Sequence, residues 1–305
     1  MTKDIEPADL YTVLRTPDLL DPVLIVHFDG WIDAGQSAGN AARHLIEVTG
    51  AEPLVQFDTE RLLDHRARRP IMHIVDGVNA GIDWPTIEIT AGRDANDHDI
   101  LILSGAEPDH NWRTFTEATM GLVDRLGVRR VVGMGAYPAA VPHTRPSRLT
   151  ITSPTVDLAR SNESRATLDV PAGIAAVIEQ GLDAAGIEAL TMWAQVPHYI
   201  PTGPYPAATL ALIVGLEESA GLSIDPGSLR EQVLGTRRHL DQLVADEDAH
   251  RAMLGELERQ YDEFGPEGGT LPTSDELAAE VEQFLRAQEP DIDDPDADPP
   301  EDAPT

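Results

Sequence analysis

Side chains suited to acid–base chemistry gather in four short segments that are rich in Gly or Pro. These segments span residues 28–37, 103–112, 135–146 and 195–206. Carboxylates and imidazoles exchange protons near neutral pH, so the candidates for catalysis are His143, His198 and Asp33. With the aromatic, charged and hydrogen-bonding residues beside them, these candidates form a larger set of candidate binding residues: Asp29, Trp31, Asp33, His143, Thr144, Arg145, His198 and Tyr199.

Arg145 has two interpretations. It lies in a loop that Pro142 and Pro146 stiffen, where a guanidinium is suited to bind the carboxylate or phosphate of a ligand. Alternatively, it pairs with a buried acid of the protein, such as Asp29 or Asp33. The chain holds 53 Asp and Glu against 22 Lys and Arg, so pairing within the protein is the preferred interpretation.

No motif for a metal or a nucleotide accompanies these side chains. The chain has no cysteine, and its His, Asp and Glu residues match neither HExxH nor an EF-hand loop. The GxGxxG, Walker A and GxSxG patterns are also missing from the sequence. We therefore expect no metal and no cofactor.

The net charge of −31 argues against nucleic acid as a partner, because a field of that sign repels phosphates. No window of 18 uncharged apolar residues is present, so a membrane span is not expected. The first 20 residues contain no apolar stretch typical of a signal peptide. We expect a cytoplasmic protein.

Strand-length apolar runs alternate with helical patterns along the chain. The predicted strands are 23–28, 53–58, 71–75, 86–90, 99–105, 129–135, 149–153 and 189–197, and the predicted helices are 34–50, 111–126, 172–185 and 207–220. This alternation predicts an α/β fold, with a mainly parallel sheet and helices on both faces. Because sites in such sheets form at the carboxyl ends of the strands, we expect the four segments to converge there.

The C-terminal part of the chain has a different pattern. Eleven positions from 229 to 264 follow an unbroken 4–3 spacing, of which eight are apolar, while Glu247 and His250 interrupt the stripe. We expect either one long helix or a helical hairpin in this region. Its apolar stripe is equally consistent with packing within the chain and with self-association. A further short helix is expected after Thr273 or Ser274. We divide the chain into an α/β core (1–224), a helical extension (225–288) and an acidic disordered tail (289–305).

The four segments carry a resemblance to a known family. "FDGWIDAG", "LSGAEPDHNW", "GAYPAAVPHTRP" and "VPHYIPTGPYPAA" resemble the recurring blocks of the proteasome assembly chaperone 2 family, in its actinobacterial branch. The resemblance implies a purine nucleoside phosphorylase-like α/β fold and a homo-oligomer, with a trimer favoured. Eukaryotic members help to assemble the proteasome α-ring through a C-terminal docking motif, which the ending "PPEDAPT" does not match.

Two classes of function follow. The first is an oligomeric assembly or scaffolding factor, in which the four segments hold the fold and an interface, and whose protein client is unknown. The alternative is an enzyme or small-molecule binder that uses a crevice lined by the four segments. There, His143 and His198 would exchange protons and Arg145 would bind an anion. We favour the first class, which is not enzymatic.

Overall fold

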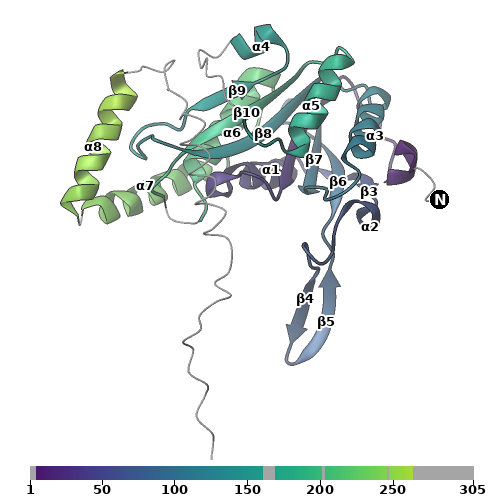
Figure 1. Ribbon diagram of the computed structural model, residues 1–305, viewed down its shortest axis with the longest axis horizontal. Helices are drawn as coiled ribbons and strands as arrows, with labels where there is room; N and C mark the ends of the chain where they lie inside the picture. The colour runs from purple at the N-terminus through teal and green to yellow at the C-terminus, as the bar shows by residue number, and fades with distance from the viewer. Residues whose placement is uncertain (1–4, 161–168, 201–202, 246, 264–305) are drawn as a thin grey trace, which may run out of the picture.

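A mixed sheet of eight strands forms the centre of the protein in the computed structural model (Figure 1). The structure describes residues 5–160, 169–200, 203–245 and 247–263, and the sheet is counted within them. The strand order is β1-β3-β6-β7-β2-β8-β10-β9. In chain order the strands are β1 (Tyr11–Val13), β2 (Val23–Asp29), β3 (Glu52–Phe57), β6 (Ile87–Arg93), β7 (Asp99–Ala106), β8 (Arg130–Ala139), β9 (Leu149–Thr152) and β10 (Ala189–Pro197).

The predicted α/β class is confirmed, with parallel pairing at the centre of the sheet. Strands β7, β2, β8 and β10 are parallel neighbours, whereas β1, β3, β6 and β9 pair antiparallel. The edges therefore depart from the parallel arrangement that the alternation of elements predicts. Strands β6 and β7 show the reason, because the turn between Arg93 and Asp99 is too short for the crossover that a parallel pair requires.

Helices cover both faces of the sheet, as predicted. Helices α1 (Ser37–Val48) and α6 (Pro206–Ala220) lie on one face, and α3 (Trp112–Arg125) and α5 (Ile174–Ala184) lie on the other. Strand β2 is buried on both sides because helices cover both faces of the sheet. Its side chains alternate between the faces, so Val23 and Ile25 face α1 and α6, while Leu24 and Val26 face α3 and α5.

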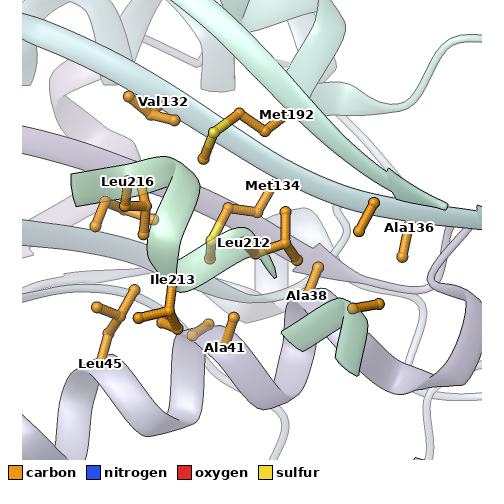
Figure 2. Close-up of a cluster of buried hydrophobic side chains, with 14 of the residues drawn as sticks. Ala38, Ala41, Leu45, Val132, Met134, Ala136, Met192, Leu212, Ile213 and Leu216 are labelled. Atoms are coloured by element: carbon orange, nitrogen blue, oxygen red, sulfur yellow. The ribbon is translucent and has the colours of Figure 1, made fainter. Parts of the chain in front are cut away.

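The core on the α1 side is built from small residues against large ones. Figure 2 shows Ala38 and Ala41 of α1 beside Leu212 and Ile213 of α6, with the methionines of β8 and β10 above them. The alanines let the two helices approach closely, so the larger side chains of α6 fill the space between α1 and the sheet. This packing places the beginning of α1 beside the carboxyl ends of β2 and β8.

Strand β8 contains two glycines because its neighbour approaches closely. A Cβ at Gly133 would lie 2.5 Å from Oγ1 of Thr191, and one at Gly135 would lie 2.4 Å from the ring of Trp193. Both neighbours belong to β10, which pairs with β8 in parallel register. The glycines of the "VVGMGAYP" run therefore serve cross-strand packing.

Strand β4 (Ile71–Val75), which the sequence predicts, does not join the main sheet. It pairs antiparallel with β5 (Val78–Asp83) in a separate hairpin that projects from the body (Figure 1). Strand β5 is not among the predicted strands. Four shorter elements complete the order up to residue 160: η1 (Pro7–Leu10), η2 (Ala34–Gln36), α2 (Thr59–Leu62) and α4 (Val156–Arg160).

The C-terminal stripe forms two helices. Helices α7 (Leu229–Ala245) and α8 (Asp248–Glu263) meet near Glu247, where the apolar stripe is interrupted. Helix α7 packs on α6, and its Leu229 and Leu240 belong to the same buried cluster as α6. The helix expected after Thr273 and the tail 289–305 lie outside the described residues. No helix within the described residues is both long and apolar enough to cross a membrane.

Candidate functional site

The four polar segments meet at the carboxyl ends of the central parallel strands. Three backbone hydrogen bonds join them: Glu107 N–H to Asp29 O (2.8 Å), Tyr205 N–H to Gly35 O (2.9 Å) and His198 N–H to Ala139 O (3.1 Å). An isolated β-bridge also links Asp33 with Ala136. The candidate side chains nevertheless divide into two groups, one at the beginning of α1 and one facing α7 and α8.

The first group, which we call the α1 cluster, consists of His27, Asp29 and Asp33. The carboxylate of Asp33 accepts hydrogen bonds from the backbone N–H groups of Ala38 (2.8 Å) and Gly39 (2.9 Å) at the first turn of α1. The buried His27 places Nε2 at 3.4 Å from Oδ1 of Asp29. A helix N-terminus stabilises a negative charge, which accounts for an acid at position 33.

The two acids of the α1 cluster have opposite pKa shifts. The imidazole of His27, with Nε2 3.4 Å from Oδ1 of Asp29, lowers the pKa of Asp29, whose side chain is largely exposed. Burial raises the pKa of Asp33, although the two backbone N–H groups oppose this shift. The cluster therefore combines an ionised surface carboxylate with a half-buried acid that holds its proton more strongly. Sequence reasoning missed His27, whose signal is its place as a polar residue within an apolar strand.

The second group, which we call the loop–helix clamp, joins the 143–145 loop to the C-terminal helices. Its loop side is His143, Thr144 and Arg145, and its helix side is Asp241 of α7 with Glu258 and Asp262 of α8. Each loop residue thus binds a carboxylate nearly 100 or more positions further along the chain.

His143 is held in a single orientation within the clamp. The hydroxyl of Tyr199 accepts a hydrogen bond from the His143 backbone N–H and lies 2.8 Å from Nδ1. Nε2 lies 3.2 Å from Oδ1 of Asp241. The Tyr199 hydroxyl can donate its own proton to Nδ1, which places the ring proton on Nε2, facing Asp241. Burial lowers the pKa of His143 and raises that of Tyr199 to about 12, so both groups are neutral at pH 7.

Arg145 pairs with acids of α8, and the suggested partners Asp29 and Asp33 are wrong. Its Nε and Nη2 donate to the two carboxylate oxygens of Asp262 at 2.9 and 2.7 Å, while Nη1 lies 3.2 Å from Oε1 of Glu258. The hydroxyl of Thr144 also donates to Glu258. Asp33 instead accepts from the first turn of α1, and Asp29 lies beside His27, so neither acid pairs with Arg145.

Helix α8 makes further contacts with the same loop. The guanidinium carbon of Arg148 lies 3.4 Å from the ring centroid of Tyr261, a cation–π geometry, and Arg148 also donates to the Tyr261 carbonyl. The Tyr261 hydroxyl donates to the carbonyl of Pro146 at 2.9 Å. Ionic, aromatic and backbone contacts thus fix α8 along the whole loop.

The remaining candidates lie apart from both groups or at their edges. Trp31 packs on Gly173, where an added Cβ would lie 3.0 Å from the indole. His198 is exposed, and its Nδ1 lies 3.3 Å from the carbonyl of Ala139. Its ring meets the edge of Tyr199 at a centroid distance of 5.5 Å. Within the described residues, no set of three or more His, Asp or Glu side chains is spaced to hold a metal ion.

A groove of about 560 Å³ lies between the clamp loop and helices α6 and α7. Its wall includes His143, Thr144 and Arg145 together with apolar residues such as Leu210 and Val214. Neither the 28–37 segment nor the 103–112 segment lines it. This groove is therefore not the expected crevice shared by all four segments.

Comparisons with known proteins agree with this architecture. The model of the PAC2 family matches residues 27–244. A proteasome-assembly chaperone homologue from Mycobacterium tuberculosis is 34% identical, with a TM-score of 0.71 over 77% of this chain and 99% of its own.

Two further solved structures are similar over most of their length. A PAC2 family protein from Streptomyces avermitilis is 34% identical, with a TM-score of 0.68 over 75% of this chain and 98% of its own. A second Mycobacterium tuberculosis protein, of unknown function, is 30% identical, with a TM-score of 0.80 over 92% of this chain and 100% of its own. A search of curated proteins found no match.

Proposed function

The chain belongs to the PAC2 family, and on that basis we propose that it is an assembly-chaperone-like protein that acts as a homo-oligomer on a protein client. A trimer is the proposed state. The first client class to test is a proteasome subunit, because a relative with 34% identity is described as a proteasome-assembly chaperone homologue. With such a client, the proposed place of action is the cytoplasm.

One observation on this chain carries the proposal: acidic side chains of its own C-terminal helices bind the side chains of the His-Thr-Arg loop. Asp241, Glu258 and Asp262 bind the three side chains that a catalytic or anion-binding role would need to be free. An arginine that already holds a carboxylate with two parallel hydrogen bonds has little capacity left for a ligand anion. The loop therefore supports a structural role, in which it fixes α7 and α8 on the core and shapes the surface offered to other proteins.

The α1 cluster supports a second candidate function, the binding of a small molecule. Asp29 is exposed beside the buried His27, and Asp33 keeps its proton more strongly than an ordinary carboxyl group. A pair of carboxyl groups with pKa values moved apart is a feature of acid–base sites. Here, however, the acid with the raised pKa also caps α1, which is a structural duty.

Native mass spectrometry of the purified full chain separates the two functions. We expect a homo-oligomeric mass without a retained small molecule, and a mixed complex when proteasome α subunits from the same organism are added. A monomer that forms no such complex would contradict the chaperone proposal. A retained small molecule that Asp33→Asn releases, while His143→Gln keeps it, would instead support the second function.

The client assay needs a matched control. Assembly of proteasome particles from purified subunits is followed with and without the protein, and faster or more complete assembly is expected in its presence. An equally acidic protein of another fold controls for the effect of a net charge of −31. The same gain with both proteins would show a charge effect and contradict the proposal.

A further inference from the structure

The β4–β5 hairpin exposes an unusual number of large apolar side chains. We call residues 71–84 the hairpin arm, and it projects from the body of the protein (Figure 1). Seven of the fourteen large hydrophobic residues that are exposed in the described part of the chain lie in it: Ile71, Met72, Ile74, Val75, Val78, Ile82 and Trp84, each 47–65% exposed. A patch of this kind marks an interaction surface.

Both faces of the hairpin arm are apolar. Side chains alternate along β4, and the register pairs Met72 with Ile82 and Val75 with Val78. Met72, Ile74 and Ile82 therefore share one face, while Ile71, Val75 and Val78 share the other. A two-stranded hairpin is only marginally stable alone in water, and one with two apolar faces gains most when another surface covers it.

Charge distinguishes the arm and the preceding residues 61–70, which we call its root, from the rest of the molecule. Residues 61–84 hold four Arg and three Asp, hence a net charge of +1, whereas the whole chain carries −31. Arg66 and Arg69 at the root are exposed, and neither takes part in an ion pair within the described residues. This region can approach an acidic surface without repulsion, and every other copy of this chain offers such a surface.

We propose that the hairpin arm docks on a second copy of this chain, where its apolar faces are buried and Arg66 and Arg69 meet carboxylates. The inference rests on the proposed homo-oligomer and names the element that holds it together. A second copy is present whenever the arm is present, whereas a client would leave both apolar faces in water between encounters. Because the arm meets a different surface on the next copy, the proposed contact is heterologous, and the proposed trimer is the ring that such contacts form when their rotation closes.

The first test places a charge on each apolar face. Ile74→Asp with Val78→Asp is compared with the wild-type full chain by light scattering over a range of micromolar concentrations. We expect the dissociation constant of the oligomer to rise by at least about tenfold. Leu20→Asp with Leu234→Asp is the matched control, because these residues are also exposed (80% and 61%) but lie outside the arm. The control should keep the wild-type mass.

A second test does not depend on how well the charged variant folds. The chain has no cysteine, so Val78→Cys gives a single position for a photoactivatable cross-linker on the arm. Irradiation of the purified protein should yield a covalent product that contains only two copies of this chain. Arg66→Glu with Arg69→Glu should reduce the yield several-fold.

The outcomes separate this inference from the proposed function. If the wild-type chain is an oligomer and the arm variant keeps the same mass, the inference is wrong while the proposed oligomer stands. If the wild-type chain is a monomer and Val78→Cys gives no cross-link, both are wrong. An arm variant that remains an oligomer but no longer binds proteasome subunits would identify the arm as a client surface and overturn the second copy as its occupant.

Discussion

Arg145 and Asp262, 117 positions apart in the chain, form a two-pronged ion pair with N–O distances of 2.9 and 2.7 Å. One residue belongs to the loop after a central strand and the other to the last turn of α8. The pair therefore forms only when α8 lies on the core. Replacing either residue should weaken the attachment of α8.

Replacing Arg145 with Ala should loosen α8 without unfolding the protein. The guanidinium and the Asp262 carboxylate are 31% and 55% exposed, and ion pairs in contact with water contribute little to global stability. We expect a nearly unchanged melting temperature together with several-fold faster hydrogen exchange of the α8 amides, measured by mass spectrometry. Arg259→Ala is the control, because Arg259 pairs with Glu256 within α8 itself. A large drop in melting temperature for Arg145→Ala would contradict this assignment.

His143 should make the protein less stable in mild acid. Its pKa is lowered in the folded state by burial, so the unfolded chain binds the proton first as the pH falls below about 6.5. The stability that the neutral ring contributes is complete above that pH and is lost as the pH falls toward the folded pKa.

Urea unfolding of His143→Gln between pH 7.5 and 5 tests this contribution. The free energy of unfolding of the variant should fall less steeply with acidification than that of the wild type. His198→Gln is the control, because that imidazole is exposed. Equal slopes for wild type and His143→Gln would mean that His143 does not carry the effect.

Glu179 of α5 should make the protein less stable as the pH rises from about 4.5 to 7. Burial raises its pKa to about 7, against an ordinary value near 4.5, and Thr191 donates a hydrogen bond to it. The stability from the protonated form is complete below pH 4.5 and is lost as the pH rises to 7. Glu179→Gln should therefore add roughly 2–3 kcal/mol to the free energy of unfolding at pH 8 and much less at pH 4.5.

The measurement for Glu179 is chemical denaturation at both pH values. The exposed Glu117 of α3 supplies the control variant, Glu117→Gln, which should behave like wild type at both. A gain for Glu179→Gln that is independent of pH would show that lost charge is not its cause.

Gly105 should tolerate no side chain. Its φ is +131°, and an added Cβ would lie 2.0 Å from the carbonyl oxygen of Thr86. Gly105→Ala should cost about 3 kcal/mol or more in the free energy of unfolding, because the clash is with backbone that cannot rotate away. Gly121→Ala in α3 has open space around it and should be neutral or slightly stabilising. Denaturant melts of both variants compare them directly, and equal stability would refute the close approach.

The local elements of this protein follow from its local patterns. Strand β2 and helix α1 lie close to their predicted spans because buried runs and helical spacing are set by neighbouring residues. Asp33 is also placed by local chemistry, since a carboxylate before a helix accepts from its first N–H groups. The break between α7 and α8 falls where the apolar stripe is interrupted, at Glu247.

Tertiary structure alone decided which distant residues meet. The sequence names Arg145 as a cation in an acidic protein, but dozens of acids compete for it, and only the path of the chain brings Asp262 to it. The same holds for β4, whose apolar alternation predicts a strand but not its place in a hairpin outside the sheet. A periodic pattern reports how each residue is buried relative to its neighbours, whereas pairing between remote segments depends on the global packing that all of them share.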